Sequence, residues 1–186
     1  MNAHARLVVA RRSCLRILVV TALSLVAVAP AVADEKSRLT EEAHEAIAAL
    51  IKSDPSVKEA MAETAGYAIF PGVGKGGLLV GGARGTGQVM VDGAPIAKVT
   101  LTQVTLGLQL GGQKYVELIL FEGKEALDRF LAGSYTMAAQ ASAVAAKSGA
   151  SANAKYADGV KVVTMAIGGL MYEASVGGQK FGIERY

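Results

Sequence analysis

The sequence predicts an α+β protein: a curved antiparallel β-sheet or small barrel, with two N-terminal helices and one inserted helix packed outside it. Apolar residues recur at helical spacing before residue 66. All 22 glycines lie at or after Gly66, where they separate short β-branched and apolar runs, as is typical of strands and tight turns. Because predicted helices do not alternate with predicted strands, a parallel sheet is disfavoured.

Residues 1–33 have the pattern of a signal peptide. The first 16 residues contain four arginines and no acid, and residues 17–29 are apolar except for Thr21 and Ser24. Ala31-Val32-Ala33 fits a cleavage site, and the apolar run is too short to cross a bilayer comfortably as an uncleaved anchor. We therefore expect export and cleavage near Ala33, which would give a periplasmic or membrane-associated protein.

The remainder of the chain is long enough for one domain and is nearly neutral. Removing the four arginines of residues 1–33 leaves 15 of the 19 basic residues against 16 acidic ones. Nucleic acid is not an expected partner, because this balance lacks the net basic charge that nucleic-acid-binding domains normally carry. We divide the chain into the signal peptide, an N-terminal helical segment over 34–54 and one domain over 55–186.

Two helices are expected before the first glycine. Thr40 is a suitable N-cap for the first helix, and two glutamates follow it where the helix dipole favours negative charge. The apolar face of this helix consists of Leu39, Ala43, Ile47, Leu50 and Ile51. The second helix begins with Asp54 as N-cap and Pro55 at the first helical position, and Gly66 ends it.

Short strands are expected from residue 67 onwards. Their ranges before residue 122 are 67–70, 77–82, 86–91, 96–101, 104–110 and 115–121. A helix over 123–131 interrupts them and directs inward Ala126, Leu127, Phe130 and Leu131. The alanine-rich segment 134–147 suits either a helix or a tightly packed strand, and we predict a strand.

The C-terminal region is predicted to end in a hairpin. A polar loop over 148–159 leads to a strand over 160–166. Residues 171–176 and 179–185 then pair around a Gly177-Gly178 turn. The phrase Gly-Gly-Gln-Lys occurs at 111–114 and again at 177–180, and we interpret both copies as hairpin turns.

Candidates for catalysis and metal binding are few. His44 is the only histidine after residue 33, and no cysteine follows that residue, so a thiol nucleophile and a zinc cluster are excluded there. Two acid pairs could be compared with those of glycosidases: Glu117 with Glu122, and Glu173 with Asp158. Solvated charges at strand ends explain them more simply. We expect no enzyme activity, no catalytic residue and no metal site.

The glycine run over 72–77 has the spacing of a dinucleotide-binding fingerprint at Gly72, Gly74 and Gly77. That fingerprint leads from a strand into a helix whose N-terminus faces the pyrophosphate. A strand and another turn follow here instead. Turn glycines are the simpler explanation, and no cofactor is expected.

Five cations differ from the other charged residues because each lies in or beside a predicted glycine-rich turn: Lys75, Arg84, Lys98, Lys114 and Lys180. Exposed backbone N–H groups in such turns can help to hold an anion. Gathered at one end of the sheet, these side chains would form a site for a phosphate head group, and we predict them as lipid-binding residues. The alternative is that they are dispersed charges that keep the surface soluble.

Several phrases, in the right order, resemble the SYLF lipid-binding domain family. They are GYAIFP at 66–71, the glycine-rich run over 75–87, GLQLGG at 107–112 and GGLMYE at 168–173. The resemblance extends from about residue 55 to the C-terminus and is more specific than any single glycine motif. It implies a module that binds phospholipids, phosphatidylinositol-type lipids in eukaryotic members and actin in some fungal ones, and that catalyses no reaction.

The chain departs from the eukaryotic members ahead of this core. Those members place a basic amphipathic helix there, whereas the first predicted helix carries Glu41, Glu42 and Glu45, which an anionic membrane would repel. The expected partner is therefore a phospholipid, phosphatidylinositol-type or another anionic lipid, or a membrane surface. Apolar strand residues would contact acyl chains while the cations hold the phosphate.

Two other classes of function stay open from the sequence. One is a structural or protein-interaction module of the cell envelope, with an envelope protein as partner and no lipid ligand. The other is an enzyme that acts on envelope glycans through a carboxylate pair.

Overall fold

The computed structural model describes residues 28–133, 136–142 and 156–186, and the chain divides into two compact units. The first unit ends at Arg38, and its described part, residues 28–38, is helical. Within it, Ser37 Oγ donates a hydrogen bond to the carbonyl of Ala33 at 3.0 Å. The second unit is Leu39–Tyr186. Most of the predicted signal peptide, residues 148–155 of the predicted loop and parts of the predicted 134–147 strand lie outside the described residues.

Among the described residues two helices precede the sheet, as predicted, but the first begins earlier than expected. Helix α2 (Val28–Ser53) contains Thr40 in its interior, so the prediction that Thr40 caps this helix is wrong. Thr40 Oγ1 instead donates a hydrogen bond to Oε1 of Gln88 at 3.0 Å. Helix α3 (Ser56–Ala62) begins one residue later than predicted, with Pro55 rather than Asp54 at its N-cap position, and Asp54 Oδ1 accepts a hydrogen bond from the backbone N–H of Ser56 at 3.0 Å.

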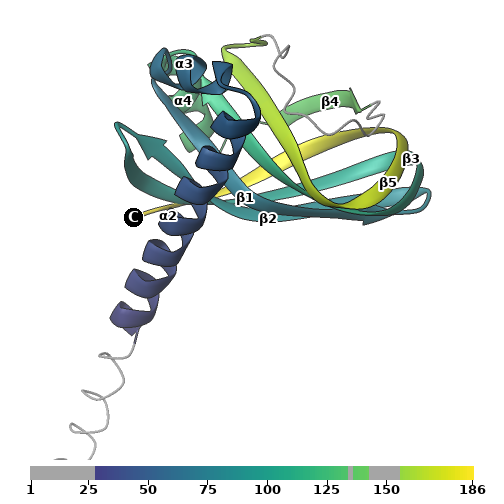
Figure 1. The fold of residues 1–186 in the computed structure, drawn as a ribbon, viewed down its shortest axis with the longest axis horizontal. Coiled ribbons are helices and arrows are strands. Elements are labelled where there is room, and N and C mark those ends of the chain that lie inside the picture. Colours follow the sequence, from purple (N-terminus) through teal and green to yellow (C-terminus); the bar gives the residue numbers. More distant parts are fainter. Residues whose placement is uncertain (1–27, 134–135, 143–155) are drawn as a thin grey trace, which may run out of the picture. The chain divides into compact units, whose positions relative to one another are not determined.

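The described strands form one curved antiparallel sheet of five strands in the order β1-β2-β3-β5-β4, which confirms the α+β class (Figure 1). Over the described residues the sheet is not closed into a barrel. The strands are β1 (Gly66–Gly77), β2 (Val80–Val91), β3 (Ala94–Phe121), β4 (Thr136–Ser142) and β5 (Val160–Arg185).

The pairings among β1, β2 and β3 are nested around one hairpin. Strands β1 and β2 pair directly, with Leu78 and Leu79 at the tip of their hairpin. Strand β3 bends around this tip, so that residues 94–106 pair with β2 and residues 111–121 pair with β1. Gly111 at this bend has a φ of 114°, which L side chains rarely adopt.

Strand β5 bends around β3 in the same way. Residues 160–171 form its first arm and pair with the second arm of β3, and residues 176–185 form its second arm and pair with the first arm of β3. The hairpin tip and both bends therefore lie at the same end of the sheet, away from α3 and α4 (Figure 1). We call this the bend end of the sheet.

Several segments predicted as turns are strand in the structure. The predicted strands over 96–101, 104–110 and 115–121 are parts of the single strand β3. The glycine-rich residues 72–77 belong to β1, whereas residues 77–82, predicted as a strand, span the hairpin tip. Because glycine has no Cβ, it lets neighbouring backbones approach closely in a strongly bent sheet. The glycines of this chain therefore mark curvature as well as turns.

The C-terminal hairpin is also a wrong prediction. Neither Gly-Gly-Gln-Lys phrase forms a turn, because residues 111–114 lie in β3 and residues 177–180 lie in β5, which continues through Gly177 and Gly178. The inserted helix is confirmed as α4 (Lys124–Leu131), and β4 confirms strand over 136–142.

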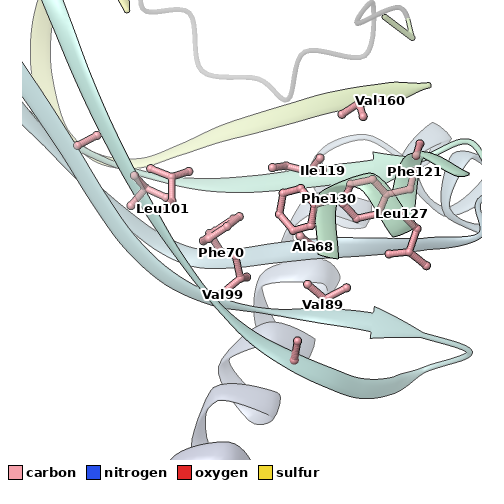
Figure 2. Packing of buried hydrophobic residues seen from close by; sticks show 14 of the residues in the cluster. Ala68, Phe70, Val89, Val99, Leu101, Ile119, Phe121, Leu127, Phe130 and Val160 are labelled. Atoms are coloured by element: carbon pink, nitrogen blue, oxygen red, sulfur yellow. The ribbon is translucent and has the colours of Figure 1, made fainter. Parts of the chain in front are cut away.

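The hydrophobic core has two parts, one on each face of the sheet. Helix α3 and the part of α2 from Leu39 onwards cover the convex face, where Ala43, Leu50 and Val57 pack among strand residues such as Ile69 and Leu118. Helix α4 packs on the concave face, where Phe130 lies beside Phe121 with the ring centroids 4.8 Å apart (Figure 2).

The curvature is visible in side-chain contacts between strands that are not neighbours. Phe70 on β1 and Phe181 on β5 have ring centroids 6.0 Å apart, although β2 and β3 lie between their strands in the sheet order. A flat sheet would separate them by about three strand spacings, or roughly 14 Å. The concave face is therefore the inside of a deeply curved sheet.

Candidate functional site

Three of the five predicted cations lie in one row across the sheet. The cross-strand pairs, in order, are Lys114 with Gly74, Gly74 with Arg84, Arg84 with Thr102, and Thr102 with Lys180. Side chains of directly paired residues point to the same face, and all three cations are exposed on the convex side. Neighbouring strands lie about 4.8 Å apart, so successive cations of this cation row are about 10 Å apart.

A glycine makes room for one member of the cation row. A Cβ atom placed on Gly72 would lie 2.6 Å from Cε of Lys114, so the lysine side chain occupies the space above this glycine. Gly74, which lies between Lys114 and Arg84 in the row, has no atom within 4 Å of a Cβ built on it. The surface between these two cations is therefore open.

Exposed aliphatic side chains lie beyond the cation row, at the bend end. Val80, Val104 and Leu106 share the convex face with the cations, and between 58 and 64 % of each residue is exposed. With three similarly exposed neighbours they form the aliphatic tip, which consists of Leu78, Leu79, Val80, Val104, Leu106 and Leu110. Apolar side chains gathered on a surface in this way mark a site of interaction with an apolar partner.

The cation row and the aliphatic tip are close together. Leu106 lies four residues beyond Thr102 on β3, which is about 13 Å along the strand. Buried residues alternate with these exposed ones: Gln103 and Thr105 point to the concave face. Because side chains alternate between the two faces of a strand, the exposed cations and the exposed aliphatic residues lie on the same side of the sheet.

The other two predicted cations do not join this row. Lys98 is half-buried on the convex face and pairs with Gln88 and Glu184, four residues before Thr102. Lys75 lies on the concave face and is 9 % exposed. All five cations lie within strands, so the prediction that they sit in glycine-rich turns is wrong, because those segments are strands.

Sequence analysis missed a buried carboxyl group on the concave face. Glu117 is 1 % exposed, so its interpretation as a solvated strand-end charge is wrong. Burial raises the pKa of Glu117 to about 7, against the opposing effects of the Gln179 hydrogen bond, the Lys75 charge and the Tyr115 hydroxyl. The alternation of side chains along a strand could have identified Glu117 as buried, since Tyr115 and Ile119, two residues before and after it, face the core.

A pocket and a histidine lie outside these surfaces. An open pocket of about 490 Å³ lies beside the start of α4, but Arg129 in its lining donates hydrogen bonds to Glu125 Oε1 at 3.3 Å and to the carbonyl of Asp158 at 2.7 Å. His44 is exposed on α2. Among the described residues, no group of three or more His, Cys, Asp or Glu could hold a metal ion.

None of the helices in the described part of the chain combines the length and apolar character needed to cross a membrane. No protein-family model matches the chain. Over 142 residues the chain is 29 % identical to a protein of Aeromonas veronii named beta cell expansion factor A. The match covers 75 % of this chain and 54 % of that protein, so the chain spans about half the length of this relative.

Proposed function

We propose that this protein binds the surface of anionic phospholipid membranes and catalyses no reaction. The observation that carries this proposal is the position of the cation row directly behind the aliphatic tip, on the same face of the sheet. A membrane interface offers the matching order, with phosphate groups outside and acyl chains inside.

The dimensions of the two surfaces fit such an interface. Apolar protein surfaces bind in the interface by burying themselves about 5–10 Å into the boundary between head groups and acyl chains. With Leu106 and Leu79 at that depth, the cation row, about 13 Å back along β3, lies at the level of the lipid phosphates. Lys114, Arg84 and Lys180 then each contact head groups.

The two surfaces contribute differently to binding. Each buried methylene of the aliphatic tip contributes about 0.8 kcal/mol, independently of salt. Each cation near an anionic surface contributes about 1 kcal/mol, and this part weakens as salt screens it. The cation row accordingly favours anionic over neutral lipid, and the aliphatic tip retains the protein once it has arrived.

We further propose that the chain is a member of the SYLF family and is exported. Support for the family comes from the phrases at 66–71, 107–112 and 168–173, two of which lie at the bends of β3 and β5. Support for export comes from the arginine-rich start, the apolar run and the Ala31-Val32-Ala33 sequence.

The first experiment tests the cation row by vesicle flotation across a salt series. We expect the protein to bind vesicles containing phosphatidylglycerol at low salt, and Arg84→Ala with Lys114→Ala and Lys180→Ala to bind them at least about tenfold more weakly. The matched control removes three exposed lysines elsewhere by substituting Ala for Lys52, Lys58 and Lys124. Equal losses in both variants, or no binding by the unaltered protein, would overturn the proposal.

The second experiment tests the aliphatic tip. The chain contains no tryptophan, so Leu79→Trp introduces a single fluorescent reporter at the hairpin tip. On binding to vesicles we expect its emission to shift to the blue and to be quenched by brominated acyl chains. Ala48→Trp, at an exposed position on α2, is the control and should change in neither respect.

A further inference from the structure

The concave face carries a polar cluster between its apolar core and the bend end. Glu117 and Lys75 belong to it, on β3 and β1, together with Gln103, Tyr115 and Gln179. Polar groups at this depth in a protein are matched by hydrogen-bond partners, so each atom of the cluster needs one.

One hydrogen bond of the cluster joins strands that are not neighbours. Gln179 Nε2, on the second arm of β5, donates to Glu117 Oε2, on the second arm of β3, at 3.0 Å. By sheet order, the first arm of β3, then β2 and then β1 separate these two arms. The contact therefore holds the two halves of the curved sheet together across its inside.

The other oxygen of each of these two side chains is buried and unmatched. Glu117 Oε1 and Gln179 Oε1 are both inaccessible, and neither has a hydrogen-bond partner among the described residues. An amide oxygen is always an acceptor, and an ionised carboxylate is an acceptor at both oxygens. With Glu117 ionised, two buried acceptors lack a donor, which is a costly arrangement.

A single proton removes both deficits. We propose that Glu117 and Gln179 form a proton-dependent clasp: with Glu117 protonated on Oε1, its O–H donates to Gln179 Oε1 while Gln179 Nε2 donates to Glu117 Oε2. Ionisation of Glu117 removes one of the two bonds and leaves Oε1 of both side chains without a donor, which weakens the clasp and loosens the two halves of the sheet on the concave face. This inference stands apart from lipid binding.

The surroundings of Glu117 fit a group that titrates near neutrality. Among the described residues, the charged or titratable groups that face it are Lys75 from β1 and Tyr115 from β3, while β5 contributes Gln179 and Thr164, which do not titrate. Helix α4 presents Leu127 and Phe130 to this face. Burial outweighs the charge of Lys75 and raises the pKa of Glu117 to about 7.

The direct test is a ¹³C NMR titration of the glutamate carboxyl carbons, in which Glu117→Gln identifies the Glu117 signal. We expect this signal to titrate with a midpoint near pH 7, well above that of exposed glutamates. A midpoint below about pH 5 would overturn the proposal, because Glu117 would then be ionised and the clasp open at neutral pH. If Glu117→Gln fails to fold, sequential resonance assignment of the unaltered protein identifies the Glu117 signal instead, so the protonation is still decided.

Amide hydrogen exchange tests the release. Between about pH 7 and pH 8 we expect protection around Gln179, corrected for intrinsic exchange, to fall up to about fivefold, because the protonated fraction of Glu117 falls from about one half to about one tenth. Glu117→Gln should keep its protection at all pH values, since two amides can form both bonds of the clasp without a proton. Glu122→Gln, an exposed glutamate at the end of β3, is the control and should behave as the unaltered protein does. Protection that is independent of pH in the unaltered protein, or that falls equally in Glu117→Gln, would overturn the clasp.

Discussion

Phe130 of α4 and Phe181 of β5 lie against each other on the concave face, with their ring centroids 4.9 Å apart. Phe130 is completely buried and contacts Phe121 as well, so one helix side chain joins the second arm of β3 to the second arm of β5. These arms are not neighbours in the sheet. The inserted helix thus fastens the end of the sheet that lies opposite the bends.

Phe130→Ala should lower the free energy of unfolding by about 3–5 kcal/mol, because it removes a buried aromatic ring and leaves a cavity. Urea unfolding monitored by circular dichroism would measure the loss. Lys124→Ala on the same helix removes a side chain that is 82 % exposed and should change stability by less than about 0.5 kcal/mol. A loss below about 1 kcal/mol for Phe130→Ala would contradict this account of the core.

Gly87→Ala should destabilise the fold by at least about 3 kcal/mol or prevent folding, which is the upper part of the range for overpacked sites. A Cβ at this position would lie 2.0 Å from the backbone oxygen of Ile69, and that oxygen cannot move without displacing β1. The comparison is Gly74→Ala, where a Cβ meets nothing within 4 Å. Thermal unfolding should give a clearly lower melting temperature for Gly87→Ala than for Gly74→Ala. Equal melting temperatures would show that β1 can shift to accept the added methyl group.

The stability of the protein should fall as pH rises through neutrality. Glu117 has a folded-state pKa of about 7 against an ordinary value of 4.5, so the folded protein binds this proton more tightly than the unfolded chain does. Its stabilising contribution is complete below about pH 4.5 and is lost as pH rises through about 7, a change of roughly 3 kcal/mol. Urea unfolding at several pH values measures this contribution as the difference in the free energy of unfolding between the unaltered protein and Glu117→Gln. A difference that is constant with pH would contradict the raised pKa.

Gln88→Leu should cost about 1–3 kcal/mol of stability. The Gln88 side chain is completely buried, accepts a hydrogen bond from Thr40 on α2 and donates one to the Tyr186 hydroxyl at 2.8 Å. It therefore ties α2, β2 and the C-terminal residue together. Differential scanning calorimetry should show a lower melting temperature for this variant than for Thr102→Ala, an exposed change on β3. Equal melting temperatures would indicate that the leucine compensates for both bonds.

Local patterns in the sequence determined the kinds of element and much of the core. The helical spacing of Leu39, Ala43 and Leu50 correctly assigns the buried face of α2, and the same is true of Leu127 and Phe130 in α4. These patterns are readable because a helix or strand repeats every 3.6 or 2 residues, whatever its surroundings. Thr40 shows the limit: a good cap residue can equally lie inside a longer helix and bond to a distant side chain.

Which residues of different strands meet depends on pairing between distant parts of the chain. Glycines at 72–77, 111–112 and 177–178 could mark turns or bent strands, and long-range pairing with the β1–β2 hairpin selected bent strands. That pairing aligned Lys114, Arg84 and Lys180 in one row and placed Lys75 on the opposite face. It also buried Glu117 against Gln179, a residue 62 positions away. Residue types and local periods can be read along the chain, whereas register and curvature depend on contacts between distant segments, and these contacts set which surfaces the residues form.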